Sequence, residues 1–100
     1  MRLRFLVPVM LLACGPAIAQ SPDSPQVRSW AAACSNCHGT QGRALEGIEK
    51  IAGVNRDKLL KKLLDYKNGR EPATIMHQLA KGYSDEQLAA IAAWFAAQKP

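Results

Sequence analysis

Two cysteines and a histidine stand within five residues of each other, in the stretch Cys34-Ser35-Asn36-Cys37-His38. On a helix these three side chains fall within roughly 100° of arc, so both sulfurs and the imidazole would lie on one side of the backbone. Side chains placed in this way can all bind the same molecule. More than any other feature, this stretch limits what the chain can fold around.

The spacing C-x-x-C-H is the signature of covalent haem attachment. Each cysteine would add across one of two neighbouring vinyl groups of the porphyrin, and the adjoining histidine would bind the iron. We therefore expect one haem c as the cofactor, with Cys34 and Cys37 as its attachment points and His38 as a metal ligand.

Three other uses of the motif explain it less well. A structural zinc site needs four ligands, and beyond the motif only His77 could add one. A thioredoxin-like redox pair is expected in a βαβ unit, for which the sequence gives no sign. A disulfide between Cys34 and Cys37 would close a trivial loop and would leave His38 unexplained.

The first nineteen residues have the pattern of an export signal. Arg2 and Arg4 precede an apolar run, and residues 17–19 have the small-x-small pattern of a signal-peptidase site. We expect cleavage after Ala19 and a periplasmic location. A second interpretation is a lipobox, in which Cys14 would carry lipid. No membrane span is expected, since the apolar run is far shorter than the roughly 20 residues that cross a bilayer.

The remaining chain is the length of one small domain. Residues 20–26 are polar with two prolines and are interpreted as a flexible lead-in, and residues 27–100 as the domain. About 80 residues form only a marginal core, so an additional staple is expected. Removal of Arg2 and Arg4 lowers the formal charge from +5 to +3, and no basic tract indicates nucleic acid.

The fold class expected is all-α, because apolar residues recur at helical spacing and no stretch alternates with period two. Residues 39–55 are expected to be a loop with about one helical turn. The expected helices are one from Val27 into the motif, one capped by Asn55 and stopping near Gly69, a short one from Pro72 to Gly82, and one with Ser84 and Gln87 as a capping box.

The second axial position of the iron decides whether a haem protein carries electrons or binds other molecules. After residue 19, Met76 is the sole methionine, and His77 is the sole histidine besides His38. Adjacent helical residues point about 100° apart, so only one of Met76 and His77 can face the iron. We expect Met76, whose soft thioether raises the reduction potential, and keep His77 as the alternative.

Four stretches, CSNCHGTQG, KIAG, YKNGREPATIM and AKGYSDEQLAAIAAWFAAQ, together resemble the monohaem class I cytochromes c. Within them, REPATIMHQLAKGYSDEQ is most similar to the cytochrome subunits of flavocytochrome c sulfide dehydrogenases, periplasmic complexes whose flavin subunit oxidises sulfide. The resemblance implies helices wrapped around one haem, with the first and last helices crossing. Trp30 and Trp94 or Phe95 would pack near that crossing.

The resemblance also implies thioether bonds at Cys34 and Cys37, His38 as the proximal iron ligand and Met76 as the distal one. The protein would be an electron carrier and not an enzyme: the haem subunit or electron acceptor of a sulfide-oxidising flavoprotein. One alternative is a free shuttle to a terminal oxidase or another haem protein. Another is a haem enzyme or gas sensor with an open iron, which requires that Met76 is not a ligand.

One position departs from the family pattern. The family usually has a proline shortly before its Ile/Leu-x-Gly, and here Glu49 stands about there, which makes the carbonyl facing the proximal histidine less rigid. Arg70 resembles a family arginine near the haem, with a solvated loop arginine as the alternative. A lysine stripe could dock an acidic partner or simply be solvated: Lys58, Lys61, Lys62 and Lys67.

Overall fold

The computed structural model describes residues 8 and 23–100. In this part of the chain the elements are α1 (Pro25–His38), the 3-10 helix η1 (Thr40–Gly42), α2 (Arg56–Lys67), α3 (Met76–Lys81) and α4 (Asp85–Ala96), with no strand. The expected all-α class is confirmed. The predicted signal peptide, the alternative lipid site at Cys14 and the start of the lead-in lie outside the described residues. None of the described helices has both the length and the apolar character to cross a membrane.

α1 begins at Pro25, two residues before the expected start at Val27. The reason is local, because Oγ of Ser24 accepts a hydrogen bond from the Val27 N–H at 3.3 Å and caps the helix. Proline is suited to a first turn, where its missing N–H has no partner to lose. The helix ends at His38, and Gly39 with φ of +81° turns the chain away.

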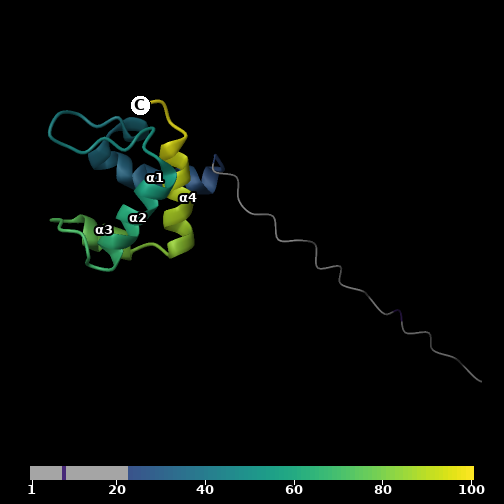
Figure 1. Ribbon diagram of the computed structural model, residues 1–100. Coiled ribbons are helices and arrows are strands. Elements are labelled where there is room, and N and C mark those ends of the chain that lie inside the picture. The colour runs from purple at the N-terminus through teal and green to yellow at the C-terminus, as the bar shows by residue number, and fades with distance from the viewer. Residues whose placement is uncertain (1–7, 9–22) are drawn as a thin grey trace, which may run out of the picture.

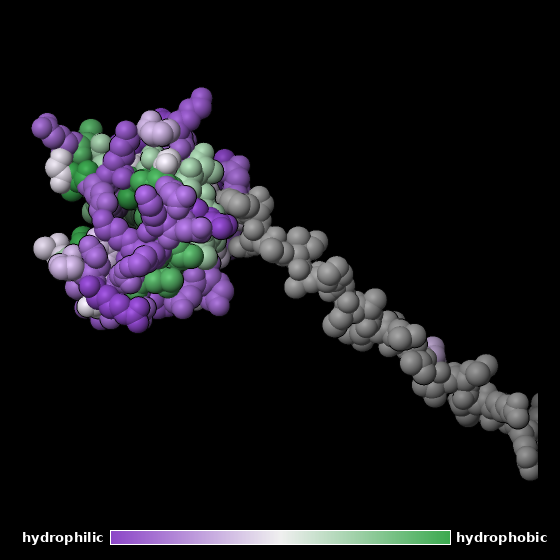
Figure 2. All heavy atoms as spheres, in the orientation of Figure 1, coloured by the Kyte–Doolittle hydropathy of each residue, from purple (hydrophilic) through white to green (hydrophobic). Residues whose placement is uncertain are grey.

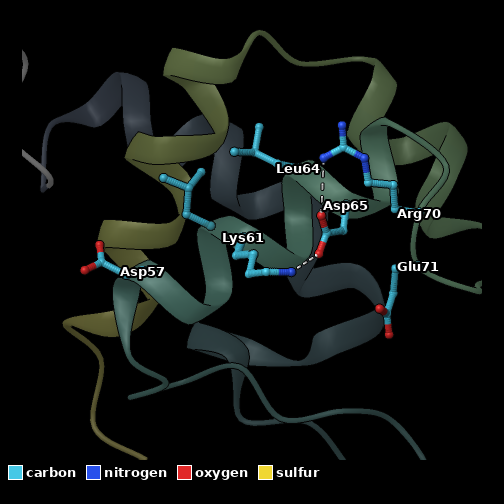
Figure 3. Close-up of a pocket in the computed structure, with 7 residues that line it drawn as sticks. Asp57, Lys61, Leu64, Asp65, Arg70 and Glu71 are labelled. Atoms are coloured by element: carbon cyan, nitrogen blue, oxygen red, sulfur yellow. Dashed lines mark hydrogen bonds and ion pairs between the residues drawn. The ribbon is translucent and has the colours of Figure 1, made fainter.

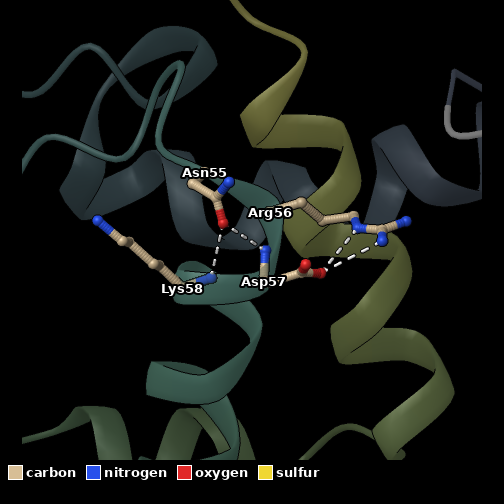
Figure 4. A network of polar contacts seen from close by, with 4 residues as sticks. All are labelled: Asn55, Arg56, Asp57 and Lys58. Atoms are coloured by element: carbon tan, nitrogen blue, oxygen red, sulfur yellow. Dashed lines mark hydrogen bonds and ion pairs between the residues drawn. The ribbon is translucent and has the colours of Figure 1, made fainter.

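α2 has the cap that the sequence predicts. Oδ1 of Asn55 accepts from the backbone N–H groups of Asp57 and Lys58, at 3.0 and 3.1 Å (Figure 4). Leu59 and Leu63 are buried one turn apart on the inner side of this helix. The cap fixes where the helix starts, and the two leucines fix which side faces inward.

α3 begins at Met76 and not at Pro72, so the expected start of this helix is wrong by one turn. Residues 72–75 instead line the cavity described below, one after another. Their place along the cavity wall therefore prevails over the local preference of proline for a helix start.

α4 has the expected capping box. Oγ of Ser84 accepts from the Gln87 N–H at 3.1 Å, and Oε1 of Gln87 accepts from the Ser84 N–H at 2.9 Å. Figure 1 shows α4 crossing α1, and the two helices are in contact. The buried core lies between α1, α2 and α4 and consists of Ala31, Ile51, Leu59, Leu63, Leu88, Ile91, Ala92 and Phe95.

Aromatic residues pack at this core, as expected. Trp30 and Trp94 are partly buried against it, and the rings of Trp94 and Phe95 meet edge to face with centroids 4.9 Å apart. The loop before α2 is tied to the same place, because the Gly53 N–H donates to the Phe95 carbonyl at 2.9 Å. The first and last helices therefore share one packed crossing.

Gly42 allows the closest approach within this core. Its φ is +79°, and a Cβ atom there would lie 2.8 Å from Cγ1 of Ile51 and 2.8 Å from Cδ1 of Phe95. Its carbonyl accepts from the N–H groups of Ile51 and Ala52 at 3.0 and 3.1 Å. The loop that follows the cysteine motif can be folded back onto α4 because this residue has no side chain.

Candidate functional site

A cavity of about 360 Å³ lies among α1, α2, α3 and α4, next to the loop that precedes α2. Figure 2 shows the surface hollowed at the left, with apolar residues inside the hollow. All four predicted site residues line this cavity: Cys34, Cys37, His38 and Met76. Its wall is otherwise mostly apolar and includes Leu59, Leu63, Leu88, Ile91 and Phe95.

The two cysteines come from the last turns of α1. Cys34 is half-buried and Cys37 is exposed, and both are free thiols. Burial raises the pKa of the Cys34 thiol, and the nearby Cys37 adds to the rise, while a backbone hydrogen bond partly offsets it. The helix thus presents both sulfurs to one cavity, as the motif spacing predicts.

His38 has a hydrogen-bond partner on one ring nitrogen. Its Nδ1 lies 2.6 Å from the backbone carbonyl oxygen of Glu49. A carbonyl only accepts, so Nδ1 carries the proton and the lone pair of the imidazole is on Nε2. Glu49, which stands where the family usually has a proline, therefore supplies the carbonyl that accepts from His38, and the ring is oriented for a metal at Nε2.

The side chain of Glu49 is also engaged. Nζ of Lys62 on α2 lies 2.7 and 2.9 Å from its two carboxylate oxygens. The hydrogen bond with Glu49 is the main reason that the pKa of Lys62 is raised, although partial burial opposes the rise. Lys62 also lines the cavity, a role that the motif does not predict.

Met76 and His77 are the first two residues of α3, but their side chains have different surroundings. Met76 is half-buried, lines the cavity and packs against the core. His77 does not line the cavity; its Nε2 contacts the carbonyl oxygen of Glu71, and its ring centroid lies 6.1 Å from that of Tyr66. Of the two expected alternatives for an axial ligand, the geometry favours Met76.

Two tyrosines that the motif does not predict also line the cavity. Tyr66 follows Leu59 and Leu63 at helical spacing on α2, and this continuation of the apolar stripe is the signal that identifies it. Tyr83 precedes α4; burial raises the pKa of its hydroxyl, and Cys34 adds to the effect. For Tyr83 the sequence carries no comparable signal.

A second, shallower hollow, of about 660 Å³, lies on the outer side of α2 (Figure 3). It contains none of the four predicted site residues. Asp65 lies at its centre, with Nζ of Lys61 2.5 Å from Oδ2 and Nη1 of Arg70 4.0 Å from Oδ1. The Arg70 side chain is 73% exposed, which matches the solvated alternative and not a place at the cavity.

The predicted lysine stripe is also largely engaged within the molecule. Lys61 pairs with Asp65, Lys62 with Glu49, and Nζ of Lys67 lies 2.8 Å from Oδ1 of Asp85. These pairs reduce the positive charge that the stripe could offer to an acidic partner.

The donor set of the cavity fits a haem. Two thiols, an imidazole with Nε2 available and a thioether line one largely apolar space, which is what covalent attachment and two axial iron ligands require. Within the described residues, no group of three or more His, Cys, Asp or Glu side chains is arranged to hold a bare metal ion. An all-helical domain with these donors around one apolar cavity is typical of haem proteins whose cofactor is covalently attached.

Sequence similarity to known proteins identifies the family. The chain is 34% identical over 86 residues to cytochrome c-553 of Nitratidesulfovibrio vulgaris, covering 81% of both proteins. It is 39% identical over 62 residues to the cytochrome subunit of sulfide dehydrogenase of Chlorobaculum tepidum. It is 37% identical over 65 residues to the thiosulfate dehydrogenase electron acceptor of Stutzerimonas stutzeri. No family model matches. The chain belongs to the monohaem class I cytochromes c.

As a member of this family the protein is an electron-transfer haem protein, and its cofactor is one covalently bound haem c. The chain matches different fractions of the length of its relatives. The match covers 62% of this chain and 56% of the sulfide dehydrogenase subunit. It covers 63% of this chain but only 30% of the thiosulfate dehydrogenase acceptor.

Proposed function

We propose that the protein is a periplasmic electron carrier in which Cys34 and Cys37 hold the haem, His38 and Met76 bind its iron, and a sulfide-oxidising flavoprotein supplies the electrons. The observation that carries the proposal is the composition of the cavity wall. All four of these side chains line it, whereas His77 does not. The haem would supply one-electron oxidation and reduction when bound there.

The residues around the cavity favour transfer of electrons over binding of substrates. The Met76 thioether would fill the last axial position and leave none open for oxygen or another ligand. This is the argument against an enzyme or a gas sensor with an open iron. The apolar wall excludes water and disfavours extra charge on the iron, and both effects stabilise the reduced form.

The choice of partner is supported by similarity alone. The relative from Chlorobaculum tepidum is a cytochrome subunit of sulfide dehydrogenase, which supports a role as haem subunit or acceptor of such a flavoprotein. The relative from Stutzerimonas stutzeri is an electron acceptor of thiosulfate dehydrogenase, which supports a second candidate, a free shuttle between redox proteins.

Anaerobic stopped-flow mixing tests these two roles. The oxidised holoprotein is mixed with sulfide and the flavoprotein subunit of a sulfide dehydrogenase, and reduction is followed at the haem α band. We expect rapid reduction that requires both reagents, with sulfide alone and flavoprotein alone as controls. Fast reduction by thiosulfate and thiosulfate dehydrogenase, but not by the sulfide system, would reject the first role in favour of the shuttle.

Cell fractionation with intact-mass analysis tests the proposed location. Cleavage after Ala19 predicts a periplasmic protein with the mass of the polypeptide that starts at Gln20 plus the mass of one haem. A membrane-bound protein with a lipidated Cys14 would support the alternative cleavage site, and a cytoplasmic protein of full length would contradict export altogether.

A further inference from the structure

Glu49 contacts two other elements of the fold at once. Its carbonyl oxygen lies 2.6 Å from Nδ1 of His38 at the end of α1. Its carboxylate oxygens lie 2.7 and 2.9 Å from Nζ of Lys62 on α2. The main chain and the side chain of one residue therefore link the histidine of the cavity to a lysine on a neighbouring helix.

The loop around Glu49 has few other means of holding that carbonyl in place. Residues 45–50 are all exposed, and the nearest backbone hydrogen bonds are one within the loop, from the Ile48 N–H to the Leu45 carbonyl at 3.3 Å, and one to a neighbouring segment, from the Ile51 N–H to the Gly42 carbonyl at 3.0 Å. No proline ring fixes φ at position 49. The position of the carbonyl therefore depends on contacts made by the Glu49 side chain.

Lys62 is well placed to make such a contact. It precedes the buried Leu63 on α2, and its side chain is 35% exposed where it meets Glu49. A half-exposed ion pair contributes little to the free energy of unfolding. Its consequence is local, because a contact to both carboxylate oxygens restricts the conformations of the loop residue that bears the carbonyl.

We propose that Lys62 and Glu49 are positioning residues that fix the hydrogen bond from Nδ1–H of His38 and thereby set the reduction potential. The inference rests on the proposed role of His38 as an iron ligand. A hydrogen bond from Nδ1–H raises the basicity of the imidazole. A more basic ligand stabilises ferric iron, so loosening this bond raises the potential.

The test compares holoprotein variants that lose one or both members of the pair: Lys62→Gln, Glu49→Gln and the double variant. Lys61→Gln is the matched control, because Lys61 is the preceding residue of α2, pairs with Asp65 at 2.5 Å and does not line the cavity. The two measurements are the exchange rate of the His38 Nδ1–H by NMR in the reduced protein and the reduction potential by redox titration.

In both single variants we expect several-fold faster Nδ1–H exchange and a higher potential, while Lys61→Gln matches the unmodified protein. The double variant resembles either single variant, because two groups that act as a unit are not additive. Charge alone gives another result: Lys62→Gln lowers the potential, Glu49→Gln raises it, and the double variant returns to the starting value. That pattern, or equal exchange in Lys62→Gln and Lys61→Gln, overturns the proposal.

The red absorption band of thioether-bound ferric iron separates this proposal from the proposed ligand set. If the band persists in every variant and exchange does not change, the positioning role fails while the ligand set stands. If the unmodified protein lacks the band, the assignment of Met76 fails, and the exchange comparison still decides the role of Lys62.

Discussion

Met76 and His77 are neighbours in the chain but lie in different surroundings. Met76 lines the cavity together with His38, whereas Nε2 of His77 contacts the carbonyl oxygen of Glu71. Adjacent helical residues differ by about 100° in direction, so a helix that begins at Met76 presents only one of the two to the cavity. The fold thus distinguishes between two residues that composition alone leaves as rivals.

Replacement of Met76 by alanine should change both the spin state and the potential of the haem. The thioether favours ferrous iron, so its loss should lower the reduction potential and open the iron to water or carbon monoxide. Absorption spectroscopy and redox titration measure both effects.

His77→Ala is the matched control for Met76→Ala. It removes a side chain outside the cavity and should leave both spectrum and potential nearly unchanged. The reverse result, in which His77→Ala changes the spectrum and the potential and Met76→Ala changes neither, would establish bis-histidine ligation. It would remove the basis for a high-potential carrier.

Haem attachment should be covalent and should need both cysteines. Because Cys34 and Cys37 line the same cavity, each can form one thioether bond. Acid–acetone extraction of the native protein should leave the colour with the polypeptide. Single variants, Cys34→Ala and Cys37→Ala, should each retain one bond and give a red-shifted α band from the unreacted vinyl group. Transfer of native haem into the solvent would refute the attachment.

Folding should depend on the haem. The cavity is lined by residues of all four α-helices, and a chain of this size has little core to replace what the cofactor buries. The double variant Cys34→Ala/Cys37→Ala, which cannot attach haem, should show reduced helicity and no cooperative thermal transition by circular dichroism. A sharp transition with native helix content would show that the polypeptide core is sufficient.

Gly42→Ala should destabilise the holoprotein much more than Gly69→Ala. Both glycines have positive φ, +79° and +72°, and a side chain in that conformation costs about 1 kcal/mol. A Cβ at Gly69 meets nothing within 4 Å, whereas one at Gly42 meets Ile51 and Phe95 at 2.8 Å, and such overpacking costs about 1–3 kcal/mol more.

Chemical denaturation of the two holoprotein variants measures this difference in the free energy of unfolding. Equal losses of unfolding free energy in Gly42→Ala and Gly69→Ala would mean that the core around Phe95 accommodates the added methyl group without loss of stability.

Features that depend on nearby residues could be predicted from the sequence. Asn55 caps α2 and Ser84 caps α4 through groups two or three positions away, so the signal and the structure coincide. The start of α3 could not, because residues 72–75 follow the cavity wall instead of the helical preference of Pro72. The pair of Glu49 and Lys62 spans 13 residues and has no local pattern at all.

The cavity wall draws on the chain from Ala33 to Phe95, and Phe95 is the next-to-last residue of α4. During synthesis, which proceeds from the N-terminus, Cys34 and Cys37 therefore appear long before the space that is to surround their cofactor. Any machinery that joins haem to this chain must either wait for α4 or recognise the cysteine motif without a finished pocket. The position of Phe95 near the end of α4 therefore also determines how late in synthesis the cavity can be completed.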